Sequence, residues 1–145
     1  MPRLKLNMPD GVDFQTRLTV RVTDLNYGGH LGNQALLGLL HEARLQFLRA
    51  LGFDELGTAD RPGLIQADAQ VAFRSEAFAG DDLTIKLTAC DVERTHFDLY
   101  YEVRTDERLV AQAKTNLAFF DYSKRKTTAV PDAFLAALDL QRMKK

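Results

Sequence analysis

The sequence has little that would form a disulfide, cross a membrane or bind a nucleic acid. Its single cysteine, Cys90, excludes a disulfide within the chain and fits a reducing, cytoplasmic location. The 19 Lys and Arg residues nearly balance the 20 Asp and Glu residues, and the net charge of −1 argues against a nucleic-acid or membrane surface as a partner. The most apolar stretch is interrupted by His41, Glu42 and Arg44, well short of the roughly 20 residues of a membrane span.

Patterns typical of metal centres and secretion signals are missing as well. The three histidines, His30, His41 and His96, have neither HxH nor HxxxH spacing, so we expect no metal site. The first six residues lack the apolar core of a signal peptide. No histidine or asparagine motif accompanies Cys90, so we expect a packed side chain there and not a nucleophile. The chemistry that the sequence supports lies in a polar hinge between the first strand and the main helix.

What is present is the composition of one globular domain. With 145 residues, 46% of them hydrophobic, the chain can bury a core, and we expect residues 1–145 to form a single domain. Apolar and polar residues alternate in five segments, as in strands that bury one face. The connections between the later segments are short and polar, which predicts antiparallel hairpins. The five segments are residues 14–23, 65–74, 83–89, 96–104 and 109–119.

One long helix is predicted over residues 32–51. Its apolar residues cover most of its circumference, so other elements must wrap around it. Asn33 is placed to cap its N-terminus, and Gly52 to end it in the left-handed conformation. A short C-terminal helix is expected to begin near Pro131. The order of elements predicts an α+β fold in which a curved antiparallel sheet of about five strands surrounds one central helix.

The hinge from Asp24 to Asn33 carries the candidate catalytic groups. Strand alternation places Asp24 and Asn26 on the buried side, where an unpaired polar group would cost roughly 1 to 3 kcal/mol. Glycines in the hinge let the backbone approach a ligand, and the first amides of the helix attract a developing oxyanion. The hinge residues expected to contact a substrate are Gly29, Leu31, Gly32 and Asn33.

Two motifs carry a resemblance to a known family. The hinge Asp24-Leu-Asn-Tyr-Gly-Gly-His-Leu-Gly-Asn33 and the helical Leu39-Leu-His-Glu-Ala-Arg-Leu-Gln-Phe-Leu48, with the element order, resemble the hotdog-fold acyl-CoA thioesterases of the 4-hydroxybenzoyl-CoA type. The resemblance covers nearly the whole chain. It implies the hotdog fold, a homodimer or homotetramer, and no cofactor except the coenzyme A of the substrate. In that family a hinge carboxylate attacks the thioester or activates water, while a helix N-terminal amide polarises the carbonyl.

The catalytic match to this family is partial. Aligning Ala43-Arg44 with the family's helical Ala-Arg places its catalytic aspartate on Asn26 and a less essential acid on Asp24. We expect Asp24 to supply the base or nucleophile, with Asn26 holding water or the thioester oxygen. His30 would position Asp24 or protonate the leaving thiolate. The structural alternatives are a turn carboxylate at Asp24, an Asx-turn at Asn26 and a hinge hydrogen bond at His30.

Three further residues are candidates for substrate binding. Glu42 lies nine residues beyond Asn33, about 13 Å along the helix, so it reaches the site only across a subunit interface or along a long pocket. Otherwise it is a polar anchor paired with a neighbouring Arg or Gln. The resemblance places Arg94 and Thr95 at the nucleotide end of CoA, where arginine suits phosphate. The alternative for these two residues is a solvated strand end.

The sequence therefore favours hydrolysis of an acyl-CoA thioester. The Asp-x-Asn pattern also resembles acyl-carrier-protein thioesterases, which adds a second substrate class. A non-catalytic acyl-CoA binding protein on the same fold is the main alternative, because Asn26 replaces the family's aspartate. A hydratase or dehydratase is a further one. Open sheet edges predict at least a dimer.

Overall fold

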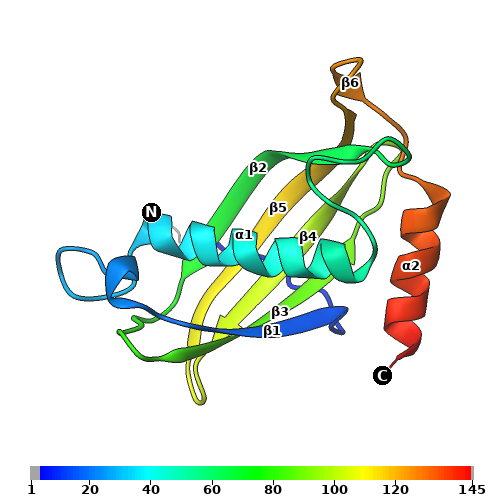
Figure 1. Ribbon diagram of the computed structural model, residues 1–145. Coiled ribbons are helices and arrows are strands. Elements are labelled where there is room, and N and C mark those ends of the chain that lie inside the picture. Colours follow the sequence, from blue (N-terminus) through cyan, green and yellow to red (C-terminus); the bar gives the residue numbers. More distant parts are fainter. Residues whose placement is uncertain (1–3, 145) are drawn as a thin grey trace.

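One antiparallel sheet wraps around one long helix in the computed structural model, which describes residues 4–144 (Figure 1). Residues 1–3 and 145, which the expected domain also includes, lie outside the described residues. The strands are β1 (Phe14–Thr19), β2 (Gly63–Phe73), β3 (Asp82–Cys90), β4 (His96–Arg104), β5 (Leu109–Asp121) and β6 (Lys126–Thr127). The helices are the 3-10 turn η1 (Val22–Asp24), α1 (Asn33–Ala50) and α2 (Asp132–Met143).

The sheet has the order β1-β3-β4-β5-β2, and the short β6 pairs with β5. All pairings are antiparallel. Because β1 and β2 are the first and last strands in this order, they form the two edges of the sheet. Helix α1 crosses the face of the sheet (Figure 1), and its side chains Leu36, Leu40 and Phe47 are buried against the strands. The expected α+β hotdog architecture is confirmed, with β6 as an addition to the five predicted strands. No helix within residues 4–144 has the length and apolarity to cross a membrane.

The ends of α1 differ from the prediction by one residue each. The helix begins at Asn33, and its N-cap is Gly32, so the prediction that Asn33 caps it is wrong. The cap makes no side-chain hydrogen bond, which leaves the first helical amides without a capping partner. At the other end Gly52 has a φ of +85° and follows the C-cap, as expected for a left-handed terminating residue.

Strand β1 ends earlier than its alternation predicts. Its pairing with β3 stops at Thr19 opposite Asp82, and the chain then turns through η1. Val22, expected in the core, is therefore 76% exposed, and Asn26 is exposed as well. Asp24 is buried as predicted, with 6% exposure, but it reaches the interior through a helical turn and not through strand parity.

Edge strand β2 departs from the alternation in its middle. Its register shifts between Gln66 and Asp68, and the residues from Gln66 to Gln70 are all exposed. Ala67 and Ala69, predicted to be buried, lie in this run. An edge strand has one row of unpaired backbone groups, so β2 offers these exposed residues to another strand.

Candidate active site

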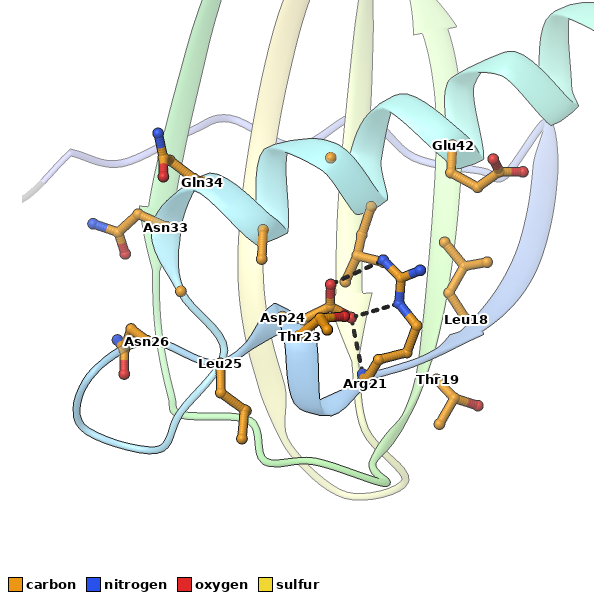
Figure 2. A pocket seen from close by; sticks show the side chains of 14 residues that line it. Leu18, Thr19, Arg21, Thr23, Asp24, Leu25, Asn26, Asn33, Gln34 and Glu42 are labelled. Carbon is orange, nitrogen blue, oxygen red and sulfur yellow. Dashed lines mark hydrogen bonds and ion pairs between the residues drawn. The ribbon is translucent and has the colours of Figure 1, made fainter.

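A cavity of about 1100 Å³ lies where β1, the hinge and α1 meet. One end contains Asp24, Asn26 and the start of α1, and Glu42 lines the same cavity farther along the helix (Figure 2). The residues from the hinge and those from the helix are brought together because Gly32 N–H donates to the Asp24 carbonyl at 3.0 Å. This backbone bond fixes the first turn of α1 beside the Asp24 side chain.

Asp24 is held by Arg21, a residue that the sequence analysis did not single out. Its Oδ2 accepts from the Arg21 backbone N–H at 2.9 Å and from Nε at 3.1 Å, and its Oδ1 accepts from Nη2 at 3.0 Å. These bonds from Arg21 outweigh the effect of burial and lower the pKa of the Asp24 carboxyl. Asp24 is therefore an ionised carboxylate at neutral pH, fixed at the cavity wall. The spacing of Arg21 and Asp24 across one 3-10 turn was the signal that could have revealed the pair.

Asn26 forms the Asx-turn that was the structural alternative for it. Its Oδ1 accepts from the backbone N–H groups of Gly28 at 2.9 Å and His30 at 3.2 Å. The side chain lines the cavity with its oxygen occupied in this way. A substrate oxygen would therefore meet the Nδ2 group of Asn26, which is a hydrogen-bond donor.

His30 does not contact Asp24. Its Nε2 lies 3.3 Å from Glu76 Oε2, and its ring packs edge-on against Phe78 with 5.7 Å between centroids. The expected pairing of His30 with Asp24 is therefore wrong, because the turn at Gly28 and Gly29 directs the ring toward the loop after β2. His30 is not among the residues that line the cavity.

The hinge amides are mostly used within the backbone. The N–H groups of Gly29, Leu31 and Gly32 donate to the carbonyls of Asn26, Ala77 and Asp24. These three N–H groups are therefore not free to polarise a substrate carbonyl, although Gly32 itself lines the cavity. The first helical residues, Asn33, Gln34 and Ala35, all line the cavity, and their amides precede the first helical hydrogen bond from Leu36 to Gly32.

The structure places Glu42 on the cavity wall, paired with Gln46 at 2.7 Å. It therefore meets both descriptions given for it, a side chain along a long pocket and an anchor bound to a glutamine. Arg44 is buried as a structural partner, since it binds Glu55 Oε2 at 2.7 Å and Gln66 Oε1 at 2.9 Å.

Arg94 and Thr95 lie at the other end of the sheet. They follow β3, whose first residue Asp82 pairs with Thr19 beside the cavity and whose last residue is Cys90. At about 3.3 Å per residue β3 spans about 26 Å, so one copy of the chain does not bring Arg94 to the hinge.

The described residues supply neither a three-ligand metal site nor an activated thiol. Among residues 4–144 no group of three His, Cys, Asp or Glu side chains has a geometry that could hold a metal ion. Burial, with help from Asp91, raises the pKa of the Cys90 thiol to about 11, which keeps it protonated. The cavity offers carboxylates, amides and a clamped guanidinium for chemistry.

The chain is similar in sequence to proteins named as CoA hydrolases. A 1,4-dihydroxy-2-naphthoyl-CoA hydrolase of Nostoc punctiforme is 29% identical over 133 residues, which cover 90% of each chain. The enzyme of the same name from Rippkaea orientalis is 27% identical over 122 residues, covering 81% of this chain and 88% of the relative.

Solved structures share the fold at lower identity. A 1,4-dihydroxy-2-naphthoyl-CoA thioesterase from Synechocystis superposes with a TM-score of 0.78 at 23% identity, covering 87% of this chain and 95% of its own. A Staphylococcus aureus protein in complex with CoA superposes with a TM-score of 0.82 at 15% identity, covering 97% of this chain and 90% of that protein. The model of the thioesterase-like superfamily matches residues 20–138, which include the hinge and α1. The chain belongs to the thioesterase-like superfamily.

Proposed function

We propose that this protein hydrolyses the thioester of an acyl-CoA to a free acid and coenzyme A, in the cytoplasm. The observation that carries the proposal is a buried, ionised carboxylate, Asp24, fixed beside the free first amides of α1 in one cavity. The names of the sequence relatives support a CoA thioester as the substrate. Incubation with a panel of acyl-CoA and acyl-carrier-protein thioesters, with detection of released thiol, tests the function and separates the two carriers.

The carbonyl of the thioester is best accommodated at the start of α1. Its oxygen would accept from the amides of residues 33–35, and the helix dipole would stabilise the negative charge that develops there. The Nδ2 group of Asn26 can add a further donor. Coenzyme A then leaves as a thiolate, which with a thiol pKa near 8.5 needs little protonation, so the distance of His30 from Asp24 is no obstacle.

Asp24 would act on the carbonyl carbon in one of two ways. As a nucleophile, one carboxylate oxygen adds to the carbonyl carbon, the C–S bond breaks, and water then hydrolyses the mixed anhydride. As a base, it removes a proton from water while the water oxygen adds to the carbon. Of the two carboxylates lining the cavity, Asp24 is the one next to the first turn of α1, whereas Glu42 is about 13 Å along the helix.

Non-catalytic acyl-CoA binding is the second candidate. Both oxygens of Asp24 already accept hydrogen bonds from Arg21, which weakens the carboxylate as a base. Asn26, in the position of the family's aspartate, has no basic oxygen. Tight binding of acyl-CoA with no release of thiol from any member of the panel would establish this alternative.

We predict a dimer in which the β2 edges of two copies pair. A two-fold axis near Asp68 would run the strands antiparallel and place residue 63 of one copy opposite residue 73 of the other. Residues 66–70 would then be covered. Light scattering should give at least twice the 16.3 kDa of the chain, and Ala69→Arg on this edge should reduce the mass. Gln15→Arg, on the opposite edge β1, is the control. A 16.3 kDa species of the unmodified protein at micromolar concentration would contradict the prediction.

The same pairing supports a role for Arg94 and Thr95 in binding CoA. Leu31 N–H donates to the Ala77 carbonyl, so the hinge lies near the C-terminal end of β2, while Gly63 at the other end pairs with Phe120. Phe119 N–H donates to the Thr95 carbonyl. In a pair of antiparallel β2 strands, the Gly63 end of one copy, with Arg94 and Thr95 nearby, would therefore lie beside the hinge of the other copy. The CoA part of the substrate would leave the cavity there.

Replacing Arg94 with Ala should weaken CoA thioester binding by about 1 to 2 kcal/mol if the side chain holds a phosphate. The loss should shrink at high salt because phosphate contacts are screened. Titration calorimetry at two salt concentrations measures both effects, with Arg49→Ala, an exposed arginine of α1, as the control. Unchanged affinity at low salt would make Arg94 a solvated strand end.

A further inference from the structure

The hinge turn that carries Asn26 is closed by both backbone groups of His30. The Asn26 N–H donates to the His30 carbonyl at 2.8 Å, and the His30 N–H donates to Asn26 Oδ1 at 3.2 Å. Gly28 N–H donates to the same oxygen at 2.9 Å. Asn26 stands beside the start of α1 (Figure 2), and with Oδ1 bound in this way its Nδ2 group is left for the cavity. The backbone of His30 therefore sets the orientation of the Asn26 amide.

The imidazole of His30 packs between the hinge and the loop after β2. A Cβ atom built on Gly28 would lie 3.4 Å from His30 Cε1, so the ring rests against the Gly28 backbone. Phe78 meets the ring edge-on with 5.7 Å between centroids, and Glu76 Oε2 lies 3.3 Å from Nε2. These three contacts restrict the rotation of the ring and the position of the backbone that carries it.

The loop after β2, residues 74–81, is itself fixed to the body of the protein. Ala77 is 1% exposed and belongs to the hydrophobic core, and its carbonyl accepts from Leu31 N–H of the hinge at 2.8 Å. Arg108, from the turn between β4 and β5, donates to the Glu76 carbonyl. The side chains that touch the imidazole therefore extend from a loop that is anchored at two points.

A contribution to folding stability does not account for these contacts. The side chains of His30 and Glu76 are 37% and 60% exposed, and exposed ion pairs stabilise a fold little. His30 is also absent from the cavity lining, so it does not touch a substrate there. What the contacts hold in place is the backbone that binds Asn26. A displaced Asn26 would misdirect a donor meant for the thioester oxygen, which affects rate more than stability.

We propose that His30 is a positioning residue whose ring, held by Phe78 and Glu76, keeps the Nδ2 group of Asn26 directed into the cavity. The inference rests on the proposed function, which gives Nδ2 the thioester oxygen as its acceptor. No proton passes through the imidazole in this role. His30 therefore needs neither a bond to Asp24 nor contact with the leaving thiolate.

A double-mutant cycle tests whether His30 acts through Asn26. His30→Ala should lower kcat about 3- to 10-fold and change KM less than about twofold, because a misdirected donor weakens binding of the transition state more than binding of the substrate. In the Asn26→Ala protein the same substitution should change kcat less than about twofold, since its effect requires Asn26. His30→Gln, whose amide can donate to Glu76, should recover part of the loss. Urea denaturation should give a nearly unchanged free energy of unfolding for His30→Ala.

Amide hydrogen exchange measured by NMR tests the positioning without a substrate. In His30→Ala the Gly28 amide, which donates to Asn26 Oδ1, should exchange about tenfold faster or more, because the turn opens more often. The Leu36 amide, in the first helical hydrogen bond of α1, should keep its rate. Phe78→Ala should give a smaller increase at Gly28, since one of the contacts to the ring is lost.

His41→Ala is the matched control. It removes another half-exposed imidazole that lies beside a glutamate, with 2.8 Å between His41 Nε2 and Glu55 Oε1, but it lies outside the hinge. Both kcat and the exchange rate of the Gly28 amide should stay unchanged in this variant.

Two results would overturn the positioning role of His30. One is an equal loss of kcat from His30→Ala with and without Asn26, and the other is an unchanged exchange rate at Gly28. Failure of every thioester to release thiol would overturn the hydrolase function alone, and exchange at Gly28 would then decide the role of His30 by itself.

Discussion

Asp24→Asn should lower the turnover of an acyl-CoA substrate by about 10² or more. The asparagine keeps the size of the side chain and an oxygen for the Arg21 hydrogen bonds, but it removes the ionised oxygen that would attack carbon or accept a proton. Affinity for the thioester should barely change, since the first amides of α1 and the other residues that line the cavity remain. Single-turnover measurements with the best substrate of the panel, together with calorimetric binding, separate the two quantities.

Variants at position 26 provide the matched controls. Asn26→Ala should lose less activity than Asp24→Asn, because Asn26 holds the hinge turn through Gly28 and His30 and does not make or break bonds. Asn26→Asp introduces the family's usual carboxylate in the same turn and should restore part of the activity of the Asp24→Asn protein. Hydrolysis by Asp24→Asn at the unmodified rate would exclude the Asp24 mechanism.

The pH dependence of activity reports on the hydrogen bonds that Arg21 donates to Asp24. Arg21 lowers the pKa of Asp24, so the essential ionised form persists as the pH falls, and activity should decline only below the pH at which an ordinary aspartate is protonated. Arg21→Ala removes the two guanidinium hydrogen bonds and the positive charge but keeps the backbone N–H bond, so the pKa of Asp24 should rise. The acidic limb of the kcat/KM profile should then move to higher pH. An unmoved limb would show that another group controls it.

Arg44→Met should lower the free energy of unfolding by about 3 kcal/mol. The arginine is 7% exposed, and its Nε donates to Glu55 Oε2 at 2.7 Å. Burial alone would raise the pKa of Glu55, but the bonds from Arg44 and His41 outweigh it and lower this pKa. Methionine fills most of the space but leaves a half-buried carboxylate with only His41. Urea denaturation at fixed protomer concentration measures the change.

Two variants show whether the loss comes from the broken ion pair. Arg49→Met removes an exposed arginine from the same helix and should change stability by less than about 0.5 kcal/mol. The double variant Arg44→Met with Glu55→Gln should recover part of the loss, because no unpaired charge remains. A loss of under about 1 kcal/mol for Arg44→Met would mean that the network contributes little to folding.

The sequence by itself determined the elements that packing periodicity controls. Alternation identified β3, β4 and β5 to within about two residues, and the apolar circumference of residues 32–51 identified α1 as the central helix. Alternation failed at the two edges of the sheet. β1 ends at Thr19 because its partner β3 begins at Asp82, and the middle of β2 is exposed because no strand of this chain covers it. Periodicity records burial, and burial at an edge depends on what lies beside it.

The sequence also located the hinge and Asp24, since a carboxylate, an amide and glycines before an apolar helix have few structural uses. Only the tertiary structure decided how those groups are connected. Arg21 donates hydrogen bonds to Asp24, and Glu76 lies within ion-pair distance of His30. The N–H groups of Leu31 and Gly32 donate to backbone carbonyls. Glu42 accepts a hydrogen bond from Gln46, and Gln46 in turn accepts one from Thr16 of β1, thirty residues earlier in the chain. Hydrogen bonds are decided by directions and distances in space, which residue types and spacings along a chain do not specify once the chain turns.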